Sequence, residues 1–495
     1  MINDARDWLY KEFVLRKLNS RFGAILLGVI AIVISFAVVN LSFVIGPVLV
    51  ALLAGLILVF ICLNYPLLGF YIIISISCFA FFPERLLGVS LPISTGIELL
   101  VFIVFVGIIL QRKNSPSDNR AFFKSPASIA ILMFFLFFLV EAFNSNMYSL
   151  AGWAFYVRRY IIFSLIYFVA FRLLDDIKKV KFFLKFWIAI ASFCAIYTCK
   201  QQWLGFFNFE HEWLTSDPHL IALYFQGGSF RKFSFLSDPA ANGILMGAMC
   251  LFCLLLGLGQ TSSRKKRTLY VMAFFMFLAM GYSGTRTASV MVPLGVALYT
   301  IMTFNNPRTL AFLVMFIFIA MFTFFGPFKN SPSIYRMRTT FMGSQEESLN
   351  IRDVNRKYIQ PYIYKNPIGG GLATSSSEGM SYNPGHPLAG FPPDSGLLKT
   401  AIETGWIGYT LAMIYYFLIL FQGVHYYYKA HDPQIRLFYV AITATLIAFI
   451  MAQYSQVAIG QVPMIFYFYP VIALLTRLLL IDKKIEHDSK IEMQA

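Results

Sequence analysis

Long apolar runs recur along the whole chain, and they restrict its possible folds more than any other feature. A helix that crosses a bilayer needs about 20 mostly apolar residues. About fourteen such runs occur, near residues 23–40, 44–63, 66–83, 97–111, 126–143, 160–173, 183–203, 241–259, 269–283, 287–304, 309–327, 395–420, 436–457 and 463–480. Because a helix satisfies its own backbone polar groups in lipid, the pattern predicts an all-α, polytopic membrane bundle of about fourteen transmembrane helices.

The composition agrees with a membrane protein. Hydrophobic residues make up 58% of the chain and charged residues only 13%, whereas about a quarter of a soluble domain is charged. The net charge of +16 is interpreted as Lys and Arg in loops beside anionic lipid. Nucleic-acid binding is excluded because no basic stripe lies on a soluble module. All six cysteines lie within apolar runs, which is typical of small core residues.

The distribution of Lys and Arg predicts the topology. With the N-terminus inside, 25 of the 40 Lys and Arg fall on inside segments, so both termini are expected to be cytoplasmic. The predicted parts are a transmembrane bundle at 1–327, a long periplasmic loop with an interfacial helix at 328–394, C-terminal transmembrane helices at 395–480 and a cytoplasmic tail at 481–495. This topology places Arg158, Arg159, Arg231 and Arg286 on the outer face.

Within the long loop, apolar residues at helical spacing predict a helix from about Ser348 to Tyr364. Pro361 is expected to kink or end it, and the sequence NPIGGG that follows is expected to break it. Its three glycines favour either a close approach of the backbone to a ligand or a flexible hinge. The sequence leaves both interpretations open.

Acidic residues at the start of the next apolar run suggest chemistry. Asp394 stands at its mouth and Glu403 nine residues later, about two and a half helical turns deeper. Asp394 is a candidate base or the N-cap of the helix, and Glu403 either orients a cation or is a buried structural carboxyl. His386, in the loop, is a second candidate base. Asp238 and Asn242 are expected to cap a helix.

Three stretches together resemble the family of bacterial O-antigen ligases and O-antigen polymerases. They are FRKFSFLSDPAANGILM (230–246), GYSGTRTASV (281–290), and RDVNRKYIQPYIYKNPIGGG (352–371) with DSGLLKTAIETGWIG (394–408). The resemblance covers roughly residues 150–420. Many family members carry a His-Asn pair nine residues before the equivalent of Glu403. This chain has Asp394 and Ser395 there, which leaves both the identity of the base and the choice between ligase and polymerase open.

The resemblance implies a GT-C-like fold and a glycosyltransferase of the inner membrane. Its donor would be a glycan on a polyprenyl diphosphate, and its acceptor another glycan or a lipid core, with no cofactor, metal or nucleotide sugar. Guanidinium groups bind phosphate oxygens in bidentate fashion, so the predicted diphosphate ligands are Arg286, Arg231, Arg159, Arg352 and Arg356. The predicted catalytic residues are Asp394, His386 and Glu403.

A transporter or flippase of lipid-linked glycans is the alternative prediction. Such proteins usually contain internal repeats and carry charges near the bilayer midplane. In this chain no repeat is evident, and the polar residues gather instead at the predicted outer surface.

Overall fold

The computed structural model describes residues 23–25, 28–29, 31–32, 35–36, 45–88, 93–111, 116–226, 228–327, 331–339 and 347–492. Half of the apolar run predicted at 23–40 lies outside these residues. The structure is 79% helical, and its one sheet over the described residues is a short antiparallel hairpin of β1 (Phe225–Gln226) and β2 (Ser229–Phe230). The all-α prediction is therefore confirmed.

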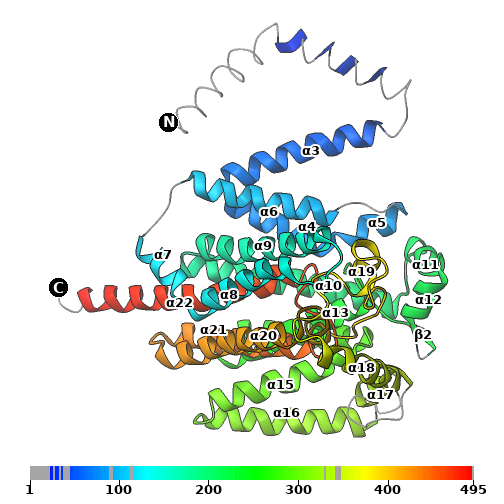
Figure 1. The fold of residues 1–495 in the computed structure, drawn as a ribbon. Coiled ribbons are helices and arrows are strands. Elements are labelled where there is room, and N and C mark those ends of the chain that lie inside the picture. The colour runs from blue at the N-terminus through cyan, green and yellow to red at the C-terminus, as the bar shows by residue number, and fades with distance from the viewer. Residues whose placement is uncertain are drawn as a thin grey trace. The chain divides into compact units, whose positions relative to one another are not determined.

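The chain forms two compact units. The first comprises residues 1–73 and 98–113, and the second residues 74–97 and 114–495. The helices in chain order (Figure 1) are α3 (Ile45–Asn64), α4 (Pro66–Phe79), α5 (Phe81–Leu87), α6 (Ile93–Leu110), α7 (Pro116–Phe123), α8 (Pro126–Val140), α9 (Leu150–Leu173), α10 (Ile177–Trp203), α11 (Asn208–Thr215), α12 (Pro218–Tyr224), α13 (Pro239–Leu258), α14 (Ser263–Tyr282), α15 (Arg286–Met302), α16 (Pro307–Phe325), α17 (Pro332–Thr339), α18 (Glu347–Lys365), α19 (Ser376–Tyr382), α20 (Gly396–Lys429), α21 (Pro433–Ala452) and α22 (Ile465–Glu492).

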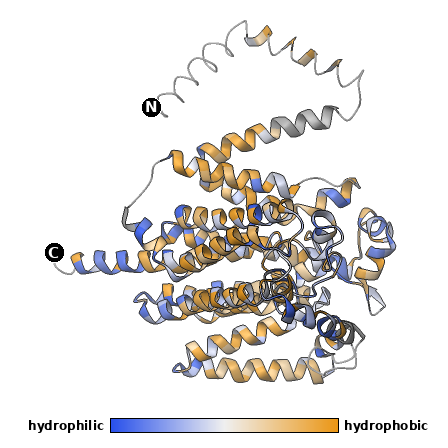
Figure 2. Ribbon diagram, viewed as in Figure 1, coloured by the Kyte–Doolittle hydropathy of each residue, from blue (hydrophilic) through white to orange (hydrophobic). Residues whose placement is uncertain are grey.

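Nine helices among the described residues are long and apolar enough to cross a membrane, or ten if the bent pair of α4 and α5 is one span. Figure 2 shows that the long helices are mostly apolar, with polar residues gathered towards their ends. Two further predicted runs, at 269–283 and 287–304, are also helices, although they are not among these nine. α14 begins with a basic sequence, and α15 has only 17 residues. The protein is thus an all-α polytopic membrane protein. α22 continues to Glu492, so the predicted tail at 481–495 is largely helical.

The second unit is built around α13, α21 and α22. In the apolar stretches of α13 and α22, 89% of the residues are buried, whereas in that of α16 only 11% are. α16 therefore presents most of its apolar surface to the surroundings. α13 packs against α14, α15 and α21, while α22 packs against α9 and α20 lies between α8 and α21. Side chains of α13, α21 and α22 consequently form much of the core of this unit.

The start of α13 shows how the core positions the polar end of the bundle. Asp238 is the N-cap and accepts a hydrogen bond from the Ala241 amide over 2.9 Å, with Pro239 in the first turn, so its predicted capping role is confirmed. Asn242 instead donates from the buried second turn to Thr198 and to the Lys232 carbonyl. At Gly243 a Cβ atom would lie only 2.4 Å from the Ser283 hydroxyl. This glycine therefore lets the α14–α15 turn pack directly on α13.

The loop helix forms where the sequence predicts it. α18 runs from Glu347 to Lys365 and ends where NPIGGG begins. Pro361 lies inside α18, so of the two predicted outcomes, a kink or a helix end, the helix end does not occur. The missing amide of a proline removes one hydrogen bond, and the helix continues for four residues beyond it.

The glycine turn after α18 completes the hydrogen bonding of a broken helix. α20 is interrupted at Gly405, whose φ of 61° and ψ of −159° are not helical. The Gly370 amide donates to the Ile402 carbonyl over 2.9 Å and the Gly371 amide to the Glu403 carbonyl over 2.8 Å. In return, the Trp406 amide donates to the Pro367 carbonyl over 2.9 Å. The glycines thus bring backbone close to backbone, which ties the long loop to α20.

Candidate active site

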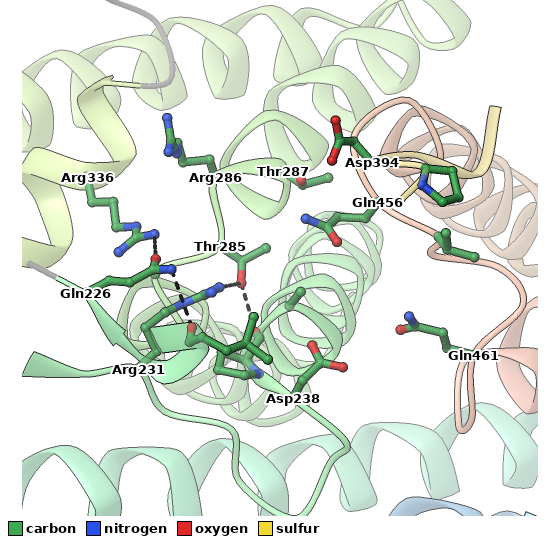
Figure 3. A pocket seen from close by; sticks show the side chains of 16 residues that line it. Gln226, Arg231, Asp238, Thr285, Arg286, Thr287, Arg336, Asp394, Gln456 and Gln461 are labelled. Atoms are coloured by element: carbon green, nitrogen blue, oxygen red, sulfur yellow. Dashed lines mark hydrogen bonds between the residues drawn. The ribbon is translucent and has the colours of Figure 1, made fainter. Parts of the chain in front are cut away.

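A cavity of about 490 Å³ lies in the second unit, where the starts of α13, α15 and α20 meet α17. Its lining is dominated by polar and charged side chains, as Figure 3 shows. The lining residues are Leu223, Gln226, Arg231, Asp238, Pro239, Ala240, Gly284, Thr285, Arg286, Thr287, Arg336, Pro393, Asp394, Gln456, Val457 and Gln461. Three arginines and two aspartates from distant parts of the sequence therefore share one cavity.

Arg231 follows strand β2 and is held by the turn before α15. Its Nε donates to the Ser283 carbonyl over 2.9 Å, and its Nη2 donates to the Thr285 hydroxyl over 3.1 Å. The pKa of Arg231 is lowered from 12.5 to about 10, mainly because the side chain is buried and secondly because the positive charge of Arg336 is nearby. The side chain is therefore still a cation at neutral pH, and an anion in the cavity would favour its charged form.

Arg286 is the first residue of α15 and is positioned by the turn Ser283–Gly284–Thr285. Gly284 has a φ of 61°, a left-handed conformation that glycine adopts at little cost. The Thr285 hydroxyl donates to the Pro239 carbonyl over 2.8 Å, which fixes the turn on α13. Figure 3 shows Arg286 and Arg336 on the same side of the cavity. The start of α15 also adds its partial positive charge there.

Arg336 is a cavity residue that the sequence did not single out. It lies on α17, within the sequence YRMR of the long loop, and its Nη2 donates to the side chain of Gln226. Two arginines separated by one residue in a short helical segment were the available signal. Their proximity to Arg231 could not be inferred, because the two segments lie about a hundred residues apart in the chain.

Asp394 lies opposite the arginines, just before α20 (Figure 3). Its Oδ2 atom is buried and accepts no hydrogen bond from any residue that the structure describes. The N-cap of α20 is Ser395, whose hydroxyl accepts from the Leu398 amide over 3.0 Å. The interpretation of Asp394 as the N-cap is therefore wrong. Its carboxylate is left available to a ligand in the cavity.

His386 does not line this cavity. Its side chain is 5% exposed, its Nδ1 accepts from the Leu388 amide over 3.1 Å, and its ring lies edge-on to Tyr148. Burial lowers its pKa from 6.5, although a hydrogen bond to the backbone of Asn146 opposes the shift. The imidazole is therefore neutral at pH 7. Its contacts with Leu388 and Tyr148 stabilise the conformation of the loop.

Glu403 is buried beside the glycine turn and outside the lining of the large cavity. Its Oε1 accepts from the Ser375 amide over 3.2 Å and from the Ser375 hydroxyl over 2.5 Å. The same oxygen lies 3.9 Å from the Lys399 ammonium. These contacts connect α20 to the loop before α19, so the carboxylate orients the loop.

The remaining predicted arginines lie elsewhere. Arg159 pairs with Glu378 over 2.9 Å and donates to the Gly460 carbonyl, lining a second, smaller cavity. Arg356 on α18 donates to the hydroxyl and the carbonyl of Tyr454. The side chain of Arg352 lies outside the described part of the structure. The large cavity thus brings together Arg231, Arg286 and Asp394 from the predicted set.

Arg85 supports the loop that carries Arg231. This buried guanidinium donates to the carbonyls of Ser234, Leu236 and Ser237, and it lies over the rings of Trp213 and Phe233. Cation–π contacts of this kind add to the hydrogen bonds. Arg85 therefore holds the segment between β2 and α13 in place.

The comparison with protein families addresses a region that contains seven of the sixteen residues lining this cavity. The family model described as O-antigen ligase matches residues 271–413, which include Arg286, Arg336, Asp394 and Glu403. A search of the curated proteins gave no match. The family match agrees with the resemblance seen in the sequence. Residues 271–413 are thus similar to the O-antigen ligase family, and this similarity supports an O-antigen ligase-type membrane enzyme.

Proposed function

We propose that the protein transfers or polymerises a glycan from a polyprenyl-diphosphate donor onto a sugar hydroxyl of an acceptor. The observation that carries the proposal is the cavity in which Arg231, Arg286 and Arg336 face Asp394. Several cations lie opposite a carboxylate whose buried oxygen accepts no hydrogen bond within the described part of the structure. This arrangement suits a reaction that needs an anionic leaving group and a base. The polyprenyl diphosphate of the donor would be the anionic leaving group, and the acceptor hydroxyl would need the base to remove its proton.

In the proposed reaction the arginines bind the diphosphate of the donor. As the acceptor oxygen attacks the anomeric carbon, Asp394 takes its proton, and the bond from that carbon to the diphosphate oxygen breaks. The polyprenyl diphosphate leaves with the bonding electrons, so the configuration at the anomeric carbon inverts. Arginines already held in place stabilise this charge without reorganisation, and one such donor contributes about 3–4 kcal/mol. The chemistry requires no metal and no nucleotide sugar.

Asp394 is favoured over His386 as the base because of position. The cavity is lined by Asp394, whereas the Nδ1 atom of His386 is occupied by a backbone amide. Glu403 then supports catalysis indirectly, by fixing the loop before α19. Arg159, Arg352 and Arg356 remain predicted ligands of the glycan or the diphosphate outside this cavity.

The proposed location is the bacterial inner membrane, with about fourteen spans in a GT-C-like arrangement and both termini in the cytoplasm. The cavity would then open at the periplasmic face. Support comes from the distribution of Lys and Arg, and from the basic start of α14 and the basic end of α20. Both lie at helix ends opposite those that line the cavity. Lipid-linked glycan and acceptor would meet there, beyond the reach of cytoplasmic ATP.

Reconstitution tests the proposal. The purified protein in proteoliposomes is given a polyprenyl-diphosphate oligosaccharide and candidate acceptors, without nucleotide sugar and with EDTA. New glycosidic bonds are expected with the wild type, and a loss of about 100-fold or more with Arg286→Ala. Arg308→Ala is the matched control, because Arg308 is exposed beyond the opposite end of α15. Movement of glycan across the membrane without a new bond would instead support the flippase alternative.

A further inference from the structure

A second cavity, of about 130 Å³, lies in the same unit between α8, α9, α20 and α22. Aromatic rings make up much of its lining, and the most prominent are Phe138, Tyr156, Tyr160, Tyr415, Tyr416 and Tyr469. Tyrosine offers both an apolar face and a hydroxyl that donates and accepts hydrogen bonds. The cavity is therefore amphipathic, and its volume suits one ring rather than a chain.

The charges around this cavity balance one another. Arg159 pairs with Glu378 over 2.9 Å, Lys399 pairs with the other oxygen of Glu378, and Lys399 lies 3.9 Å from Glu403. Two cations thus meet two carboxylates. Among the described residues that line this cavity, each cation has a carboxylate partner, so the site favours a neutral ligand over a phosphate. An isoprenoid would bury the tyrosine hydroxyls and the ion pairs against hydrocarbon, at a cost of a few kcal/mol for each polar group left unsatisfied.

One thin wall separates the two cavities. Val457 lines both of them. The start of α20 is bonded to the same wall, because the Gly396 amide donates to the Gln456 carbonyl and the Leu397 amide donates to the Gln453 carbonyl, each over 3.2 Å. Gln456 belongs to the arginine cavity and Gln453 to the aromatic one. A ligand in the aromatic cavity is therefore about one side chain away from the chamber that contains Asp394.

From these observations we infer that the aromatic cavity binds one neutral sugar ring of the acceptor glycan and directs a hydroxyl of that ring towards Asp394 past Val457. Aromatic faces pack on the C–H faces of a sugar, and the tyrosine hydroxyls and Gln453 match its hydroxyl groups. The assignment to the acceptor, rather than to the donor glycan, rests on the proposed function. The binding of a neutral sugar does not.

Direct binding tests the site without any transfer reaction. Methyl α-glucoside, α-galactoside and α-mannoside are added as probes to the full-length protein in lipid nanodiscs and followed by saturation-transfer NMR. At least one probe is expected to bind, and Ala412→Phe is expected to abolish binding, because Ala412 lines the cavity and is 4% exposed. Ile414→Phe is the matched control on the same helix, where the side chain is 39% exposed. Binding of no probe, or equal binding by both variants, overturns the site.

Tyr416→Phe keeps the ring and removes one hydroxyl, so it tests the site even if Ala412→Phe does not fold. We expect sugar binding to weaken about 5- to 10-fold. Arg286→Ala, which the proposed function predicts to be inactive, is expected to bind the sugar normally. Normal sugar binding by a wild type that transfers no glycan would support this site while refuting the proposed function.

Kinetic measurements distinguish a sugar of the acceptor from a sugar of the donor. In the transfer assay, Tyr416→Phe is expected to raise the KM for the acceptor about 5- to 10-fold and to leave the KM for the polyprenyl-linked donor unchanged. A rise confined to the donor KM would overturn the assignment to the acceptor. Active transfer with both KM values unchanged would overturn the sugar site itself and leave the proposed function standing.

Discussion

The guanidinium of Arg231 is hydrogen-bonded to the backbone of Ser283, with 2.9 Å between Nε and the carbonyl oxygen. Arg286 begins α15 three residues later. Two cations from separate motifs are therefore held at a fixed separation by one short turn. Since a diphosphate presents its oxygens in a compact group, this rigidity is what an anion site requires.

Replacement of Arg231 by lysine should separate charge from geometry. Arg231→Lys keeps a cation but cannot reproduce the two hydrogen bonds to Ser283 and Thr285. Glycan transfer is expected to fall about 100-fold in the reconstituted assay. Arg308→Lys, at an exposed site, should transfer normally. If Arg231→Lys were as active as the wild type, charge alone would suffice and the geometric argument would fail.

Asp394 and its neighbour Ser395 should have separable roles. Asp394→Asn preserves the shape of the side chain but removes the proposed base, so kcat is expected to fall about 100- to 10,000-fold with little change in Tm. Ser395→Ala removes the N-cap of α20 and should cost about 1 kcal/mol of stability with a nearly normal kcat. Measurements of kcat and Tm for both variants decide the matter. A full kcat for Asp394→Asn would eliminate this carboxylate as the base.

His386 should govern stability rather than the pH dependence of catalysis. Its pKa is lowered in the folded protein, so the unfolded chain binds more protons as the pH falls through about 6.5, and stability decreases. His386→Gln is expected to reduce this dependence of Tm on pH. The acid limb of the kcat profile should stay where it is in the wild type. A shift of that limb in His386→Gln would indicate that the imidazole takes part in proton transfer.

The break in α20 predicts an unequal response to two glycine substitutions. Gly405 and Gly385 both have positive φ values, 61° and 82°. A Cβ at Gly405 would lie 2.0 Å from the Pro367 carbonyl oxygen, whereas nothing lies within 4 Å of one at Gly385. Gly385→Ala should cost about 1–3 kcal/mol from backbone strain alone. Gly405→Ala should lower Tm much further. Equal losses would show that the contact with the glycine turn contributes little.

The sequence predicted the membrane fold and parts of the site for identifiable reasons. Long apolar runs have a single stable solution in lipid, so the helices were predictable. Arg286 and Arg231 stood out because cations near apolar segments are costly and therefore rare. Arg336 was missed because a basic residue in a polar loop carries no such signal, and only the packing of α17 brings it to the cavity.

Other errors came from short-range ambiguity. Asp394 and Ser395 are both good N-caps, and which one caps α20 depends on where the helix begins. The contribution of His386 could not be predicted either, since a Gly–His–Pro sequence is typical of an exposed loop. Its burial arises from contacts with Tyr148, more than two hundred residues earlier in the chain.

The joint between the glycine turn and the broken helix restricts how this enzyme can be recombined with its relatives. Pro367, Gly370 and Gly371 satisfy backbone groups of residues 402–406 that a continuous helix would satisfy by itself. A chimaera whose exchanged loop followed a different backbone path would leave two carbonyls and one amide of α20 unsatisfied, at about 1–3 kcal/mol for each group. Residues 366–371 and 402–406 therefore form one structural unit. Substitutions that change the backbone of one segment are expected to be tolerated only with compensating substitutions in the other.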